Sequence, residues 1–66
     1  MFSEYEEASM GRILAGEGDW FSAQLARLIV KADINNQTRL SLGFPTEVAF
    51  IQNYLAGEKD GIHDHR

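Results

Sequence analysis

Residues 19–55 of this chain read DWFSAQLARLIVKAD, INNQTRLSL and GFPTEVAFIQNYL in succession, and each of the three segments has the pattern of a short helix. In the first segment, apolar residues recur at steps of three and four, which places them on one helix face. These residues are Phe21, Leu25, Leu28, Ile29 and Ala32. Asp19 suits the N-cap position of this helix. We expect the helix that follows Asp19 to supply most of the core.

Two further helices are predicted after it. Asp33 can cap a helix over residues 34–42, and Gly43 is expected to take the left-handed conformation that ends many helices. Pro45 suits the first turn of the next helix, because its missing N–H has no partner there anyway. Gly57 is expected to end that helix. The apolar residues assigned to the contacts of these two helices are Ile34, Leu40 and Leu42, and Val48, Phe50, Ile51, Tyr54 and Leu55.

The N-terminal segment has the signals of one more helix, over residues 4–15. Ser3 and Glu6 have the spacing of a capping box, and Gly16 is a natural stop. The acidic first turn (Glu4, Glu6 and Glu7) either lies in solvent at the positive end of the helix dipole or docks a basic partner. Residues 58–66 are predicted to form a mobile tail after a single helical domain over residues 1–57.

The predicted fold is an all-α, compact bundle of three to four short helices. A chain of 66 residues gains little net stability from one core, and domains of this size often depend on disulfides, metals or partner chains. The chain has no cysteine, which excludes disulfides and thiolate metal sites. We therefore expect oligomerisation to complete the bundle.

Charge and hydropathy limit the classes of partner. The net charge is −4, and residues 1–19 carry five acidic residues and one arginine, so nucleic acid is an unlikely partner. No apolar run approaches the roughly 20 residues that cross a bilayer, so no membrane association is expected. The acidic N-terminus does not resemble a signal peptide, and a cytoplasmic location is predicted.

Three basic residues in the well-patterned region form a candidate ligand-binding set: Arg27, Lys31 and Arg39. Arg27 and Lys31 are one helical turn apart, and Arg39 joins them if the next helix folds back. Together they could hold a phosphate or carboxylate through charge-assisted hydrogen bonds. Alternatively, they form an ordinary solvent-exposed face.

Several apolar side chains are candidates for an interface: Trp20, Phe21, Leu28, Phe50 and Tyr54. Their helical spacing is typical of core residues. A chain this short cannot cover all of them, so one or two are expected to meet another subunit or a target, where aromatic anchors dominate the binding energy.

No catalytic constellation is recognised in the sequence, so the chain is not expected to be an enzyme or to need a cofactor. It lacks a cysteine nucleophile and a glycine-rich phosphate loop. His63 and His65 could bind a metal ion, but nothing in the tail would orient their rings, and no metal site is predicted.

The pattern Arg27-Leu28-Ile29, Lys31-Ala32-Asp33, Asn36, Arg39-Leu40, Gly43-Phe44-Pro45 and Glu47-Val48 resembles a group of small uncharacterised proteins encoded by bacteriophages and prophages. This resemblance covers about a third of the chain and implies a mobile-element accessory gene that acts in the cytoplasm of a bacterial host. It implies no activity and no functional residues.

Two functions follow as hypotheses. The first is a self-associating, non-enzymatic accessory protein that binds a host protein and could thereby interfere with host defence. The second is an oligomeric sponge that binds an anionic small molecule, such as a nucleotide signal, through Arg27, Lys31 and Arg39.

Overall fold

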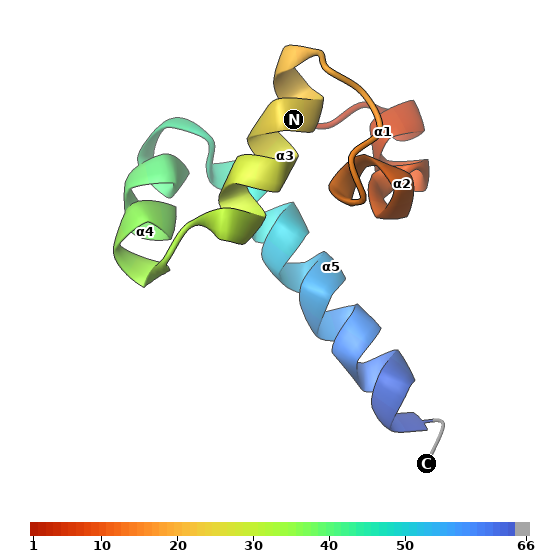
Figure 1. Ribbon diagram of the computed structural model, residues 1–66. Coiled ribbons are helices and arrows are strands. Elements are labelled where there is room, and N and C mark those ends of the chain that lie inside the picture. Colours follow the sequence, from red (N-terminus) through yellow and green to blue (C-terminus); the bar gives the residue numbers. More distant parts are fainter. Residues whose placement is uncertain (65–66) are drawn as a thin grey trace.

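The computed structural model describes the backbone of residues 1–64 and the side chains of residues 1–57 (Figure 1). Over residues 1–64 the chain forms helices and no strand, which confirms the all-α prediction. The helices are α1 (Glu4–Ala8), α2 (Met10–Leu14), α3 (Phe21–Lys31), α4 (Ile34–Gly43) and α5 (Pro45–Asp64).

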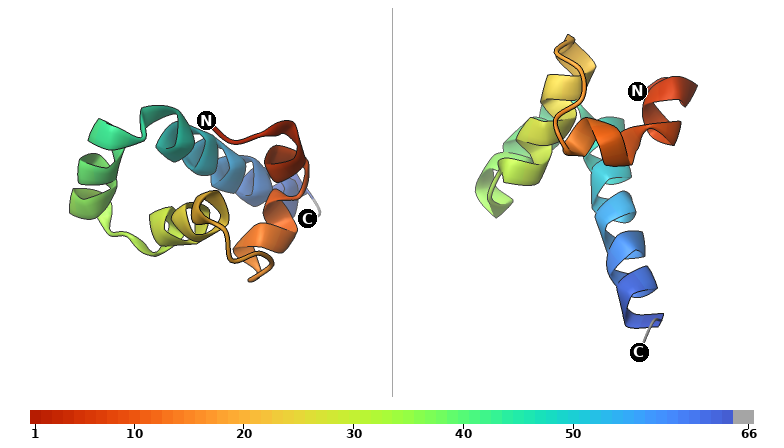
Figure 2. Two further views of the ribbon diagram at one scale, coloured as in Figure 1. Left: turned by 90° about the horizontal axis from the view of Figure 1, so that it is seen from above. Right: turned by 45° about the vertical axis from the view of Figure 1, so that its right-hand side comes forward.

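Helix α3 occupies the middle of the molecule. Helices α1 and α2 lie on one flank of α3 and α4 lies on the other, as the two further views also show (Figure 2). The first part of α5 packs against α3 and α4, and its last part extends beyond the other helices. No described helix is both long and apolar enough to cross a bilayer.

The core forms where α2, α3 and α5 meet. Its largest fully buried side chains are Met10 and Ile13 from α2, Ile29 from α3 and Ile51 from α5. The other buried apolar residues are Phe2, Ala23, Leu25, Ala26 and Val48. The N-terminal helices therefore pack on their own chain, and α2 buries two of its large residues there.

Two predicted end signals of the N-terminal segment are confirmed. The Ser3 hydroxyl accepts from the Glu6 backbone N–H, and the Glu6 carboxylate accepts from the Ser3 N–H at 2.8 Å, which is a capping box. At the other end, Gly16 has φ +123°, and the N–H groups of Gly16 and Glu17 bond to the carbonyls of Ile13 and Arg12. This is a Schellman motif, which needs a residue that tolerates positive φ.

The single helix predicted over residues 4–15 is wrong. The chain turns at Ser9, which has φ −103° and ψ 12° and separates α1 from α2. The Ser9 side chain is buried, and its hydroxyl accepts from Arg12 at 2.9 Å. This hydrogen bond joins the turn at Ser9 to the side of α2.

Other predicted boundaries are also corrected. The N-cap of α3 is Trp20, not Asp19. Gly43 ends α4 without a positive φ. Helix α5 does not end at Gly57 but continues to Asp64, because an interior glycine costs only about 1 kcal/mol and does not stop a helix. The predictions that Asp33 caps α4 and that Pro45 opens α5 are confirmed.

The predicted apolar faces of α3 and α4 are partly wrong. The face of α3 predicted to form the core includes Phe21 and Leu28, but these two side chains are 67% and 51% exposed. Ile34 and Leu42 were assigned to the contacts of α4, yet both are exposed as well. Helix α3 is apolar on more than one side, and the residues it buries against the neighbouring helices are Ala23, Leu25, Ala26 and Ile29.

Candidate interaction groove between α3 and α4

An open groove of about 470 Å³ lies between α3 and α4. We call it the α3–α4 groove. Its lining comes from the last turns of α3, the short link and α4: Leu28, Lys31, Ala32, Asp33, Asn36, Arg39 and Leu40. This size falls in the range of ordinary binding sites, and three of the seven side chains are apolar. The groove can therefore take an apolar group that also carries charge.

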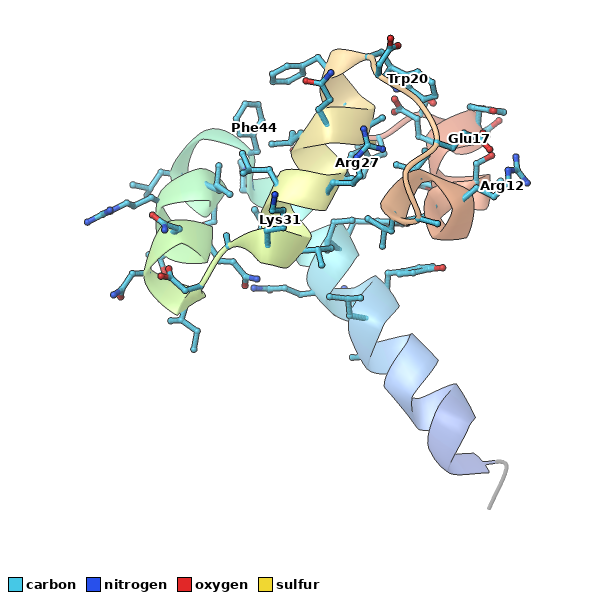
Figure 3. The ribbon with its side chains drawn as sticks, viewed as in Figure 1. Arg12, Glu17, Trp20, Arg27, Lys31 and Phe44 are labelled. Carbon is cyan, nitrogen blue, oxygen red and sulfur yellow. The ribbon has the colours of Figure 1, made fainter. Side chains whose placement is uncertain are left out.

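The apolar part of this surface continues along α3 beyond the groove. Phe21 lies two turns before Leu28, on the same side of the helix. The Phe21 ring packs against Phe44, with ring centroids 5.9 Å apart. Because Phe44 directly follows α4, this pair connects the start of α3 with the end of α4 (Figure 3). Leu28 and Phe21 together give α3 an exposed apolar strip.

The charged part of the groove is Lys31 and Arg39. Among the described side chains, neither has a carboxylate within ion-pair distance. Arg39 makes only a long contact, 3.4 Å, with the Asn36 side-chain oxygen. The Asp33 carboxylate accepts from the Asn36 backbone N–H at 2.8 Å and is thereby held as the cap of α4. Two exposed cations thus border an apolar floor in an acidic protein.

Arg27, the third residue of the predicted ligand-binding set, is not part of this groove. Its guanidinium donates to the backbone carbonyls of Ile13 at 2.8 Å, Glu17 at 3.0 Å and Gly18 at 2.6 Å. It points towards the segment after α2, whereas Lys31 lies at the edge of α3 nearest α4 (Figure 3). The structure brings Lys31 and Arg39 together and gives Arg27 a structural contact instead.

Gln37 connects the two walls of the groove. Its side-chain amide donates to the carbonyls of Ile29 at 3.1 Å and Ala32 at 3.3 Å, and its oxygen accepts from Gln52 at 3.1 Å. The carbonyls at the C-terminus of α3 are thereby satisfied by α4, which is in turn bonded to α5. Gln37 therefore fixes how far apart α3 and α4 lie.

The five predicted interface residues do not form one surface. Phe21 and Leu28 lie on the outer side of α3. Phe50 and Tyr54 are half-buried: Phe50 packs edge-on against Phe2, with centroids 5.6 Å apart, and stacks with Tyr54. Trp20 is 38% exposed and packs towards α1, where its indole N–H donates to Glu6 at 2.7 Å. Only Phe21 and Leu28 belong with the groove.

Helix α1 presents a second exposed surface, which we call the α1 face and define as Glu4, Tyr5, Glu7 and Ala8. All four residues are exposed, whereas Glu6 points inward. The backbone N–H of Ser3 and the Trp20 indole hold the pKa of Glu6 below its ordinary value. The α1 face therefore carries two exposed carboxylates and an exposed tyrosine.

Among the described residues, no group of three or more His, Cys, Asp or Glu side chains could hold a metal ion. The side chains of His63 and His65 lie outside the described residues. A second hollow of about 520 Å³ between α4 and α5 is lined by uncharged residues. The α3–α4 groove is thus the charged one of the two.

Comparison with known proteins gives no relative. No protein-family model matches the chain, and neither a curated protein nor a solved structure matches it.

Proposed function

We propose that this chain is a small, non-enzymatic interaction protein that self-associates and also binds a host protein, with the α3–α4 groove as its contact surface. One observation carries the proposal. Leu28 and Phe21 are more than half exposed beside Lys31 and Arg39, two cations without an acidic partner among the described side chains. Apolar anchors with a charged rim are the usual composition of a protein interface.

The energy available from these anchors supports a contact of moderate affinity. Fully burying a Leu or Phe side chain contributes roughly 1.5–3 kcal/mol. Leu28 and Phe21 already bury part of their surface, so each has about half or more of this gain left to make in a complex. Lys31 and Arg39 add orientation and faster association with an acidic partner rather than much affinity.

The test replaces one anchor with a charge. We expect Leu28→Glu to abolish association in sedimentation velocity, at concentrations where the wild type is heavier than its monomer mass of 7.4 kDa. The matched control is Leu42→Glu, because Leu42 is in α4, is 83% exposed and does not line the groove. Equal association of the two variants would contradict the proposal.

Because the chain resembles bacteriophage-encoded proteins, we propose that its other partner is a protein of the bacterial host. This partner would bind the same groove, in the cytoplasm of the host. A protein captured from bacterial lysate by the wild type and by Leu42→Glu, but not by Leu28→Glu, would support it. A protein captured equally by all three would bind elsewhere.

A second candidate function is binding of an anionic small molecule, favoured by the presence of Lys31 and Arg39 in one groove. This site consists of Lys31 and Arg39 without Arg27, which the sequence-based hypothesis included, because the Arg27 guanidinium donates to three backbone carbonyls. A ligand that binds only the folded chain raises its melting temperature. We expect such a rise with nucleotides for the wild type and not for Lys31→Gln. No rise across a nucleotide panel would exclude this function.

A further inference from the structure

We propose that the α3–α4 groove of one copy takes the α1 face of a second copy, so that copies associate head to tail. This inference rests on the proposed function, which makes the groove a contact surface, and it identifies the self-association partner surface. The observations behind it are the charges of the two surfaces, an exposed tyrosine and the placement of α1 and α4 around α3.

The charges of the two surfaces are opposite. The α1 face presents Glu4 and Glu7, which are exposed and lie about one turn apart on the same side of the helix. The groove presents Lys31 and Arg39 together with one carboxylate, Asp33, so its net charge is positive. Opposite potentials accelerate encounter and fix the register of a complex. The chain as a whole carries −4, so a basic groove on it is a local exception that suits the acidic part of another copy.

The α1 face also has an anchor for the apolar floor. Tyr5 is 56% exposed. The centroids of its ring and of the Trp20 ring are 6.5 Å apart, and its hydroxyl donates to the Glu17 carboxylate at 3.3 Å. These contacts restrict the ring before binding, which reduces the entropy lost when it is buried. A pre-positioned tyrosine on the same helix as two exposed carboxylates matches a groove that combines a leucine with two cations.

The positions of the two surfaces favour a contact between different copies. Helices α1 and α4 lie on opposite flanks of α3, so a chain cannot fill its own groove (Figures 1 and 2). A contact between two different surfaces is heterologous, and it produces rings or open chains of copies rather than an isolated two-fold dimer.

The alternative two-fold contact, groove against groove, is disfavoured by the same charges. It would bring Lys31 and Arg39 of one copy close to Lys31 and Arg39 of the other. The groove has one carboxylate, Asp33, which caps α4 and can offset only one of the two cations of the facing copy. Like charges placed together across an interface are a strong barrier to association.

Two charge-reversed proteins test the proposal. The groove variant carries Lys31→Glu and Arg39→Glu, and the α1 variant carries Glu4→Lys and Glu7→Lys. All four side chains are exposed, so the fold should tolerate the changes, and circular dichroism with Trp20 fluorescence checks this. At a concentration where the wild type has at least about twice its monomer mass, we expect each variant alone to sediment as a monomer. An equimolar mixture should regain association, because each junction again joins opposite charges.

The outcomes separate the inference from the proposed function. If the wild type associates, Leu28→Glu does not, and the α1 variant associates like the wild type, the groove is an interface but its occupant is not the α1 face. If both variants are monomeric and their mixture is too, the inference also fails. If the wild type itself is monomeric throughout, self-association through the groove fails, and the inference fails with it.

A cross-linking experiment keeps the proposal testable if a charge-reversed variant does not fold. The chain contains no cysteine, so single cysteines report one position each. Ala8→Cys marks the α1 face and Asn36→Cys marks the groove. We expect a disulfide-linked pair to form faster in the mixture than in either protein alone. Linkage that is as fast within one variant as in the mixture would overturn the head-to-tail arrangement.

Discussion

The indole nitrogen of Trp20 lies 2.7 Å from Oε2 of Glu6, and this hydrogen bond joins the start of α3 to α1. Oε1 of the same carboxylate accepts from the Ser3 backbone N–H. One buried side chain therefore completes a helix cap and holds two helices together. Because Trp20 is the only tryptophan in the chain, its fluorescence reports directly on this contact.

Replacing Glu6 with Gln should destabilise the protein. The amide of Gln has one accepting oxygen, which can serve Ser3 or Trp20 but not both in the present geometry. We expect a loss of about 1–3 kcal/mol in the free energy of unfolding, measured by urea denaturation at low protein concentration. Glu7→Gln is the control, since Glu7 is exposed in the same turn. Equal stability of Glu6→Gln and the wild type would show that the Trp20 contact contributes nothing.

Acid should weaken the fold through two carboxylates. The Ser3 backbone N–H, chiefly, holds the pKa of Glu6 below its ordinary value of 4.5, and the amino group of Met1 does the same for the pKa of Glu47. Groups with a lowered pKa in the folded state contribute stability that is present above the unfolded value and lost as the pH falls through the folded value.

The free energy of unfolding should therefore stay level above about pH 5 and fall progressively below about pH 4.5. Urea denaturation at a series of pH values measures this dependence. Glu6→Gln should show a smaller fall than the wild type, since one of the two groups is gone. A curve that stays flat well below pH 4 would contradict the role given to both carboxylates.

Arg27 should be required for stability and not for binding. Its guanidinium reaches three carbonyls at once, and the single amine of Arg27→Lys cannot reproduce this geometry. We expect Arg27→Lys to lose about 1–3 kcal/mol in urea denaturation. Lys31→Gln is the matched control, because Lys31 is an exposed cation one turn away, and it should unfold like the wild type. If Lys31→Gln lost more free energy of unfolding than Arg27→Lys, the structural role of Arg27 would be contradicted.

Some features of the fold could be predicted from the sequence because their causes are local. The capping box at Ser3, the cap at Asp33, the stop at Gly16 and the start at Pro45 each depend on residues within one turn of each other. The inward face of α3 could not be predicted in this way. Leu28 and Ile29 fit the same periodic pattern, and only the positions of α2 and α5 decide that Ile29 is buried and Leu28 is exposed.

The same distinction holds for the candidate site. That Lys31 and Arg39 line one groove depends on the turn at Asp33, and the sequence pattern indicates this arrangement. The role of Arg27 depends on carbonyls that are 9 to 14 residues away along the chain, which no local pattern reveals. The break at Ser9 could not be predicted either, since Ala8 and Met10 on its two sides both favour a helix.

Two glycines should respond in opposite ways to substitution by alanine. Gly18 has φ +92°, and a Cβ atom there would lie 2.5 Å from the Trp20 ring. Gly18→Ala should therefore cost at least about 1–2 kcal/mol and change the Trp20 fluorescence. Gly57 is inside α5 with open space around it, so Gly57→Ala should stabilise the helix by about 0.5–1 kcal/mol. Thermal unfolding of the two variants checks both signs, and a stabilised Gly18→Ala would contradict the packing of Trp20.

The proposed function requires that another protein chain covers the exposed apolar strip of α3. The most direct measurement is the weight-average mass of the wild type by light scattering, from about 1 µM to about 1 mM. We expect a rise from 7.4 kDa to more than twice that mass, and a smaller rise at high salt, which screens the charges of Lys31 and Arg39. A mass that stays at 7.4 kDa over the whole range would contradict it.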